Sequence, residues 1–286
     1  MIYKNLNQAF VEQLSHLKSS GNIVNSRGSK QIEITFVNMV IEDPTQLDIE
    51  VPIRKFNKDY AIGEWLWYIS GNQKSNNIGK IASIWKDISD SYGEVESNYG
   101  TYLFNYQKDF TQWNWVIEEL INDSDSRRAT IAINQPYHKT QNKKDYPCTQ
   151  YIQFFIRENK LDMGVYMRSN DAVFGFCNDV FTFCLFQQLM LNELNSRGFN
   201  LELGKYYHSA GSFHLYERHF KMMDTILNNY YLKAIKDGYP ETKKTSLKEG
   251  LTFRKLISLR GEMPQKDMTK KEIFDFINSQ KGVLFR

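Results

Sequence analysis

The spacing of apolar residues predicts a chain of alternating helices and strands. In residues 5–19, Phe10, Val11, Leu14 and Leu17 recur three or four positions apart, which places them on one side of a helix. Further helices are expected at residues 59–70, 109–121, 180–194, 218–235 and 270–279, and strands at residues 31–42, 149–157 and 201–207 and after Arg128. Residues 20–30 are expected to form a turn-rich loop. Strands interleaved with long helices indicate a single α+β domain over residues 1–286.

One polar stretch interrupts this pattern. Residues 165–180 read VYMRSNDAVFGFCNDV and lie between an apolar strand region at 151–165 and the apolar helix expected at 180–194. Polar groups at the junction of a core strand and a core helix cost folding free energy unless partners satisfy them. The stretch is therefore either a functional site, where local rules are commonly broken, or a polar turn with helix caps.

Composition bounds the class of protein. The chain has 286 residues, of which 41% are hydrophobic, 14% aromatic and 24% charged, enough for a sizeable core in a soluble protein. No run approaches the roughly 20 apolar residues of a membrane span, and the N-terminus lacks the apolar core of a signal peptide. A soluble cytoplasmic protein without membrane contact is expected.

The net charge of +3 does not by itself indicate nucleic-acid binding. The charge is uneven, since residues 241–286 contain 11 Lys and Arg against 6 Asp and Glu. This basic C-terminal segment either attracts anions or forms a solvated surface.

Neither the cysteines nor a group of histidines has the spacing of a metal site. These residues are Cys148, Cys177 and Cys184, and His208, His214 and His219. The odd cysteine number favours reduced thiols, and histidine separations of six and five residues do not match the helical two-histidine zinc arrangement. We expect hydrogen-bonding histidines and no metal.

Two residues are candidates for acid–base or nucleophilic chemistry. Glu64 lies among Trp65, Leu66 and Trp67, so its carboxyl must be exposed on one helix face, paired, or shifted in pKa. Cys148 follows Pro147 at the start of a strand. Its thiol is a nucleophile if a positive neighbour lowers its pKa, and inert core otherwise.

Arginines occur where anions are commonly bound. Arg127 and Arg128 precede a β-branched strand, an arrangement that suits forked hydrogen bonds to phosphate or a solvated pair. Arg27 lies in an Arg-Gly-Ser loop that either wraps an anion or is plain surface.

Taken in order, the motifs resemble the thymidylate synthase superfamily. They are GEWLWYISG, IWKDISDSYGEVESNYG, DSRR, PC, MRSNDAVFGFCND and GSFHLY, and they run from about Glu64 to Tyr216, more than half the chain. The resemblance implies a three-layer α/β fold whose large mixed sheet forms the interface of a symmetric homodimer. Each active site then borrows arginines from the other subunit. The basic segment 241–286 is not explained by it.

The resemblance also implies roles for individual residues. Cys148 is similar to the nucleophile, and Glu64 to the glutamate that orders active-site water and relays protons. The expected phosphate ligands are Arg168, Ser169 and Arg27, with Arg127 and Arg128 from the other subunit.

The remaining roles concern the sugar, the base and the folate. His214 and Tyr216 resemble the pair that grips the sugar hydroxyl, and Asn170 belongs to the nucleotide site. The residues on the folate side are Trp85, Asp171 and Gly175, and Asp171 also faces the nucleotide.

The departures from the family pattern concern the base. Asp179 stands where thymidylate synthases usually have asparagine, whose one donor and one acceptor suit uracil. Cytosine reverses both groups, and a protonated Asp179 can donate to its ring nitrogen and accept from its amine. Asp179 can alternatively be a surface residue that caps the following helix. Asn170 replaces the usual cysteine, Thr149 a histidine and Ser212 an aspartate, and all three changes run toward the pattern of the bacteriophage deoxycytidylate hydroxymethylases.

The expected function is therefore deoxycytidylate (dCMP) 5-hydroxymethylation, in the host cytoplasm if the source is a phage. A thiolate that adds to carbon 6 of the pyrimidine turns carbon 5 into a carbanion. This carbon takes the one-carbon unit of 5,10-methylenetetrahydrofolate, and water then adds. The alternatives are a dCMP methylase or thymidylate synthase, which release dihydrofolate, and a non-catalytic nucleotide- or RNA-binding protein on the same fold.

Overall fold

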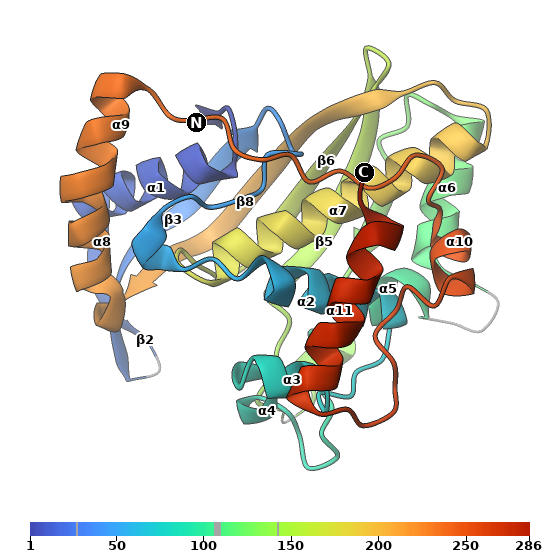
Figure 1. The fold of residues 1–286 in the computed structure, drawn as a ribbon, viewed down its shortest axis with the longest axis horizontal. Helices are drawn as coiled ribbons and strands as arrows, with labels where there is room; N and C mark the ends of the chain where they lie inside the picture. The colour runs from blue at the N-terminus through green and yellow to red at the C-terminus, as the bar shows by residue number, and fades with distance from the viewer. Residues whose placement is uncertain (27, 106–109, 142) are drawn as a thin grey trace. The chain divides into compact units, whose positions relative to one another are not determined.

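The computed structural model describes residues 1–26, 28–105, 110–141 and 143–286 (Figure 1). They form two compact units, each drawn from three segments of the chain. The first comprises Met1–Phe56, Met163–Cys184 and Gly204–Thr245, and the second Asn57–Asp162, Leu185–Leu203 and Ser246–Arg286. The expectation of one domain over residues 1–286 stays a prediction. No described helix is long and apolar enough to span a bilayer.

The first unit is built on a mixed sheet. Strand β3 (Ser29–Ile41) pairs antiparallel with β8 (Glu202–Tyr216), with Gln31 opposite Tyr216 and Ile41 opposite Tyr206. Strand β1 (Ile2–Tyr3) runs parallel to β3, β2 (Asn22–Ser26) antiparallel to β3, and β7 (Asn170–Asp171) parallel to β8. The other neighbour of β8 is β6 (Lys160–Met167). This mixture of parallel and antiparallel strands with helices confirms the expected α/β fold class.

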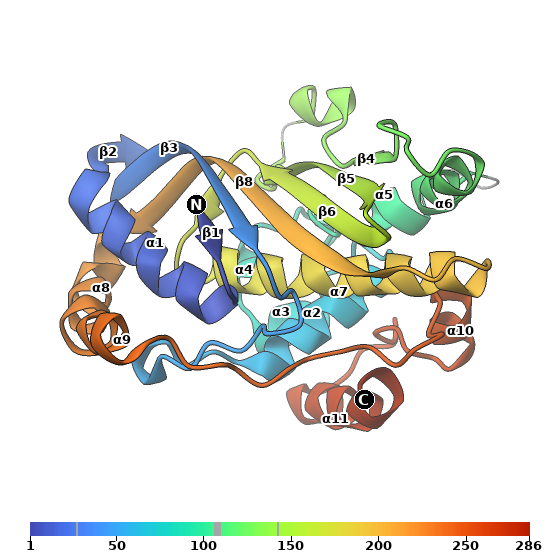
Figure 2. The same cartoon turned by 90° about the horizontal axis from the view of Figure 1, so that it is seen from above.

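Helices pack against this sheet. Helix α1 (Leu6–Ser20) lies along β3 (Figure 2). It begins where the Asn5 side chain accepts a hydrogen bond from the Gln8 N–H at 2.9 Å, which satisfies one of the free donors of the first turn. The expected helix at 218–235 is present as consecutive short elements. These are η3 (Glu217–His219), α8 (Phe220–Ile226), the π-helix η4 (Leu227–Tyr231) and α9 (Leu232–Asp237).

The second unit, as far as the structure describes it, is mainly helical and contains the antiparallel strands β4 and β5. Asn57 caps the start of α2, and Gly71 ends it with a φ of 57°, a conformation that favours glycine. The elements of this unit are α2 (Lys58–Ser70), α3 (Ile78–Ile81), α4 (Ile84–Asp87), α5 (Gly100–Phe104), α6 (Gln112–Asn122), β4 (Thr130–Ala132), η2 (Pro136–Lys139), β5 (Thr149–Arg157), α10 (Phe253–Ser258) and α11 (Lys270–Leu284).

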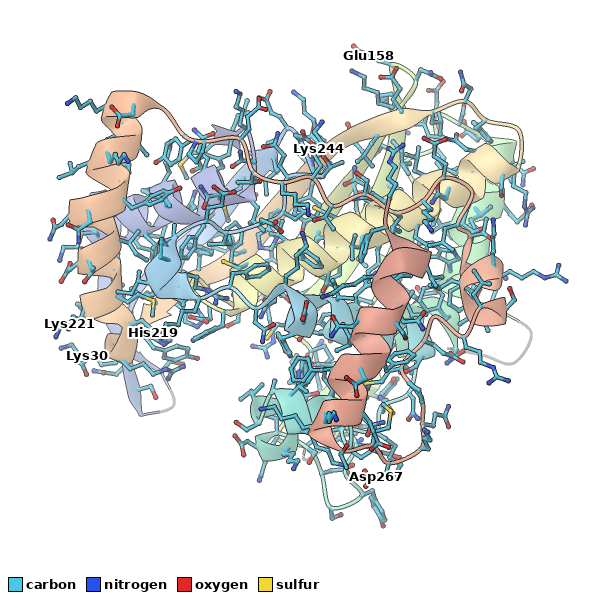
Figure 3. All side chains as sticks on the ribbon, viewed as in Figure 1. Lys30, Glu158, His219, Lys221, Lys244 and Asp267 are labelled. Carbon is cyan, nitrogen blue, oxygen red and sulfur yellow. The ribbon has the colours of Figure 1, made fainter. Side chains whose placement is uncertain are left out.

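The basic C-terminal segment is folded into the second unit. Helix α11 packs against α2 and lies next to it in Figure 1. The same pair of helices is seen from above in Figure 2. A Cβ on Gly63 of α2 would approach Ile277 Cδ1 to 2.7 Å, so glycine permits this close packing. Lys281 pairs with Asp59 at 2.6 Å. Asp267, labelled in Figure 3, pairs with Lys80 at 2.5 Å in the connection that leads into α11.

Four expectations on element boundaries were wrong. The loop expected at residues 20–30 contains strand β2, and the strand expected at 201–207 continues to Tyr216 as β8. The apolar region 151–165 is two strands, because the chain turns at Glu158 and Asn159, which have φ values of 49° and 58°. Glu158 is labelled in Figure 3. Helix α7 (Gly175–Ser196), which begins in the first unit and continues into the second, starts five residues before its expected position.

Candidate active site

The polar stretch lies where β6 ends and α7 begins, as its pattern predicted. Arg168 and Ser169 are half-buried, and Asn170 and Asp171 form β7 beside Phe213 and His214 of β8. The Asp171 carboxylate accepts hydrogen bonds from the Phe174 N–H at 2.8 Å and the Gly175 N–H at 3.3 Å. Asp171, rather than Asp179, is therefore the cap of the following helix, and it explains why α7 starts at Gly175.

Asp179 is half-buried and lies at the end of a chain of hydrogen bonds that continues into the core of the first unit. The Asn170 amide nitrogen donates to Asp179 Oδ2 at 2.8 Å, and Asn170 Oδ1 lies 2.9 Å from His208 Nε2. His208 Nδ1 in turn lies 3.0 Å from the Tyr206 hydroxyl. Burial lowers the pKa of His208 to about 3, so the imidazole is neutral. A neutral imidazole has one N–H, and this geometry places it on Nε2 with the Tyr206 hydroxyl donating to Nδ1.

Gly175, expected on the folate side, lies next to the hydrogen bond between Asn170 and Asp179. A Cβ at position 175 would be 3.2 Å from Asn170 Nδ2 and 3.5 Å from Asp179 Oδ2. Such contacts are tight enough to displace the amide. Glycine at this position therefore preserves the hydrogen bond between Asn170 and Asp179.

His214 and Tyr216 lie together on β8, with their rings edge to face at 5.0 Å between centroids. Ser212 Oγ lies 3.3 Å from His214 Nδ1 and donates a short hydrogen bond to the Glu33 carboxylate, which β3 places directly across from His214. Burial lowers the pKa of His214, although the carboxylates of Asp171 and Glu33 oppose this effect. The sequence interpretation missed Glu33, because only the strand register brings it beside His214.

Arg54 is a second residue that the sequence interpretation missed. It is 4% exposed, its Nε donates to the Val173 carbonyl at 2.6 Å, and its guanidinium stacks on Phe174 at 4.6 Å. Burial raises the pKa of the neighbouring Cys177 to about 11, even though Arg54 opposes the shift. Through these contacts with Val173 and Phe174, Arg54 stabilises the turn between β7 and α7. A lone arginine in the apolar stretch VPIRKF was the available signal.

In the second unit, Glu64 is buried on α2 and hydrogen-bonded. Its carboxyl is 4% exposed and accepts a short hydrogen bond from the Tyr60 hydroxyl, which itself accepts from Trp85 Nε1 at 3.0 Å. Burial raises the pKa of Glu64 to about 7, while the hydrogen bonds oppose this shift. Of the three alternatives for Glu64, burial excludes exposure on a helix face, and the carboxyl is both hydrogen-bonded and raised in pKa. Trp85 is held by Trp67, with ring centroids 4.9 Å apart.

Cys148 is the accessible thiol. It lies between Pro147 and the first residue of β5 and is half-buried, whereas Cys177 and Cys184 are fully buried. None of the three forms a disulfide. Gln150 Nε2 donates to the carbonyl of Cys148 at 3.3 Å, which helps to hold the backbone at this position.

Arg127 and Arg128 are exposed at the start of β4. Arg128 Nε lies 2.9 Å from Glu119 Oε1, and its side chain is 75% exposed. The remaining candidate, Arg27, lies outside the described residues. Within the described part of the chain, no three His, Cys, Asp or Glu side chains are grouped to hold a metal ion.

The predicted residues thus fall into two groups, one in each unit. The first unit brings together the nucleotide candidates, which are Arg168, Ser169, Asn170, Asp171, Gly175, Asp179, His214 and Tyr216. The second unit contains Cys148, Glu64 and Trp85. Glu64 and Trp85 are linked by hydrogen bonds to the Tyr60 hydroxyl.

Sequence comparison agrees with these motifs. A thymidylate synthase family model matches residues 8–245, so the chain belongs to the thymidylate synthase family. It is a folate-dependent one-carbon transferase that acts on pyrimidine nucleotides, which confirms the expected enzyme class.

Several phage enzymes are similar to the chain. The deoxycytidylate 5-hydroxymethyltransferase of Enterobacteria phage T2 is 30% identical over 231 residues, which cover 78% of this chain and 91% of the relative. The enzyme of the same name from Enterobacteria phage T4 is 31% identical over 216 residues, covering 73% and 85%. The deoxyuridylate hydroxymethyltransferase of Bacillus phage SP01 is 25% identical over 293 residues, covering 97% and 72%.

Proposed function

We propose that the chain is a deoxycytidylate 5-hydroxymethylase that converts dCMP, 5,10-methylenetetrahydrofolate and water into 5-hydroxymethyl-dCMP and tetrahydrofolate. The observation that supports cytosine most directly is the hydrogen bond from Asn170 to Asp179. The similarity to phage enzymes named as deoxycytidylate 5-hydroxymethyltransferases points in the same direction.

The base preference follows from the donor and acceptor pattern of Asp179. The Asn170 amide donates to Oδ2, so a proton on the Asp179 carboxyl is favoured on Oδ1 instead. The carboxyl then offers one acceptor and one donor, which match the exocyclic amine and the unprotonated ring nitrogen of cytosine. Uracil presents the opposite pattern and would leave both groups mispaired, at a large cost in a buried site.

Cys148 is proposed as the nucleophile. Its thiolate forms a bond to carbon 6 of the ring, which makes carbon 5 nucleophilic. The folate supplies the one-carbon unit to carbon 5 and departs as tetrahydrofolate after carbon 5 loses its proton. Water then adds to the exocyclic carbon, and the bond between sulfur and carbon 6 breaks to restore the thiolate.

Glu64 is proposed to position this water and to relay its proton. A carboxyl with a pKa of about 7 can both accept and return a proton at neutral pH. The Tyr60 and Trp85 side chains hold it in one orientation. Trp85, whose ring is itself fixed by Trp67, fits the flat ring system of a folate, and Asp171 and Gly175 are proposed on the same side.

The sugar and phosphate are proposed to be bound by the remaining candidates. His214 and Tyr216 receive the sugar hydroxyl, while Arg168, Ser169 and Arg27 bind the phosphate. Remote binding of this kind orients the reacting ring.

We also propose a homodimer in which Arg127 and Arg128 serve the active site of a second copy. Both arginines are exposed, as a role outside their own subunit requires. Large apolar side chains are exposed on the strands, among them Phe36 at 73% and Tyr207 at 40%, and a dimer interface would cover them.

The test is to incubate the purified protein with methylenetetrahydrofolate and an equimolar mixture of dCMP and dUMP, and to measure product masses together with the absorbance of dihydrofolate. The proposal predicts a hydroxymethyl group on dCMP and no dihydrofolate. C148S serves as the control and should form no product. A hydroxymethyl group on dUMP would contradict the base assignment, and no turnover with salt-sensitive RNA binding would favour the non-catalytic alternative.

A further inference from the structure

A buried group of ionisable side chains lies along the segment that leads to Cys148, and the proposed chemistry uses none of them. Glu96 and His138 are each 4% exposed and Asp145 is 8% exposed, all within the second unit. Charged or titratable residues are rarely this buried without a specific partner, so their contacts require an explanation.

Glu96 is the centre of this group. Its carboxylate forms a short hydrogen bond with Lys143 Nζ, and it accepts from the Tyr102 hydroxyl at 2.8 Å and from Gln73 Nε2 at 3.1 Å. Burial alone would raise the pKa of Glu96, but these hydrogen bonds outweigh it and hold the pKa below its usual value. Glu96 is therefore an anion paired with a lysine of the segment that precedes Cys148.

Neighbouring groups complete the environment of this ion pair. His138 Nδ1 accepts from the Gln135 N–H at 3.1 Å, which leaves its proton on Nε2, 2.8 Å from the Tyr102 hydroxyl. Asp90 lies 3.6 Å from Lys143 Nζ. Tyr102 consequently accepts a hydrogen bond from His138 and donates one to Glu96. The hydroxyl of Tyr102 is therefore satisfied both as an acceptor and as a donor.

The residue after Glu96 binds the same segment a second time. The Ser97 N–H and the Ser97 hydroxyl donate to the two carboxylate oxygens of Asp145, each at 2.7 Å. Burial raises the pKa of Asp145, although these two bonds oppose the shift. Consecutive residues 96 and 97 thus hold residues 143 and 145, and we call Glu96, Ser97, Lys143 and Asp145 the loop anchor.

The backbone from Lys143 to Cys148 has no helix or strand of its own, so side chains must fix its path. The loop anchor ends three residues before Cys148, and the Tyr146 hydroxyl adds a bond to Asn134 Oδ1 at 3.0 Å. We propose that the loop anchor positions the Cys148 thiol for attack on the pyrimidine ring. This inference rests on the proposed role of Cys148 as nucleophile.

The test measures the thiol directly. Cys177 and Cys184 are fully buried, so iodoacetamide applied to the native protein reports Cys148, with C148S as the background. The variants are S97A, which removes one bond to Asp145, and K143M, which removes the cation of the ion pair. The matched control is K74M, because Lys74 pairs with Glu94 at 2.9 Å in the same region but both side chains are partly exposed, at 47% and 35%.

The expected result is a changed midpoint in the pH profile of alkylation for S97A and K143M, with kcat reduced about tenfold to a hundredfold and a smaller change in KM for the nucleotide. K74M should match the unaltered protein. A lower melting temperature with an unchanged alkylation profile and kcat would overturn the proposal. S97A keeps the backbone bond to Asp145, so it is expected to fold even if K143M does not. Alkylation needs no nucleotide, so its outcome is independent of whether dCMP is the substrate.

Discussion

The side-chain amide of Asn170 donates a hydrogen bond to Oδ2 of Asp179 at 2.8 Å. Asn170 cannot rotate to exchange its oxygen and nitrogen, because its Oδ1 accepts from the buried, neutral His208. His208 is fixed in turn by Tyr206. The orientation of Asp179 is therefore set by residues in the core of the first unit, which is what a group that distinguishes two bases by donor and acceptor pattern requires.

Replacing Asp179 by asparagine is expected to exchange the base preference. D179N should lower kcat/KM for dCMP by at least about a hundredfold and raise it for dUMP, because a mispaired buried polar group is costly. Steady-state kinetics with both nucleotides give the ratio. D224N is the control, since Asp224 pairs with Lys18 on the surface. Retention of the dCMP preference in D179N would refute the base assignment.

The protonation of Glu64 should be visible in stability. Its pKa of about 7 in the folded protein exceeds the usual 4.5, so the folded state binds the extra proton and loses stability as pH rises through 7. At pH 8 the penalty is on the order of 3 kcal/mol, at about 1.4 kcal/mol per pKa unit. E64Q removes the penalty and should be more stable than the unaltered protein at pH 8, while kcat falls.

Urea unfolding of both proteins at pH 5 and pH 8 measures this effect, and their difference isolates Glu64 from other buried acids. E249Q is the control, because Glu249 is on the surface, paired with Arg286. If E64Q and the unaltered protein had the same pH dependence of unfolding free energy, Glu64 would not carry the shifted pKa.

Glu33 should act on the sugar hydroxyl through Ser212 and His214. E33Q is expected to raise KM for dCMP about tenfold, since hydrogen bonds to a charged group contribute about 1.5–3 kcal/mol. The increase should vanish with 2′,3′-dideoxycytidine monophosphate, which lacks the hydroxyl. E42Q is the control, because Glu42 directly follows β3 and pairs with the exposed Lys205. An equal effect on both nucleotides would indicate general disruption of the strand instead.

The contact between α2 and α11 should depend on the size of residue 63. G63A is expected to destabilise the protein by about 1–3 kcal/mol, because a Cβ there would meet Ile277 Cδ1 at 2.7 Å. The double variant G63A/I277V should recover part of the loss. G282A in α11 is the control, because outside the neighbouring backbone of its own helix nothing lies within 4 Å of the new Cβ, and it should stabilise by up to about 1 kcal/mol. Equal unfolding free energies for G63A and G282A would contradict the packing account.

Local sequence rules predicted the position of the site better than the bonds within it. The dense polar run between two apolar segments indicated a strand–helix junction, and the junction lies there, between Met167 and Gly175. The bond from Asn170 to His208 spans 38 residues and depends on strand pairing, which no local pattern encodes. The same holds for Glu33, 179 residues from Ser212.

Strand β8 illustrates why some of the expected element boundaries were wrong. Residues 208–212 read HSAGS, a composition typical of a turn. Tertiary pairing overrides this tendency, because β3 pairs with β8 from Tyr206 to Tyr216, on both sides of this stretch. The short helix α10 was likewise not predicted. Its first residue, Phe253, stacks on Phe104 with 4.0 Å between ring centroids, a contact between residues far apart in the sequence.

Addition of water is the step that separates the proposed reaction from methylation, and isotope labelling tests it most directly. The reaction is run with dCMP and methylenetetrahydrofolate in water enriched in oxygen-18, and the mass of the nucleotide product is measured. We expect 5-hydroxymethyl-dCMP that carries one oxygen-18 atom, with tetrahydrofolate as the other product. A methylated nucleotide without added oxygen, formed together with dihydrofolate, would contradict it.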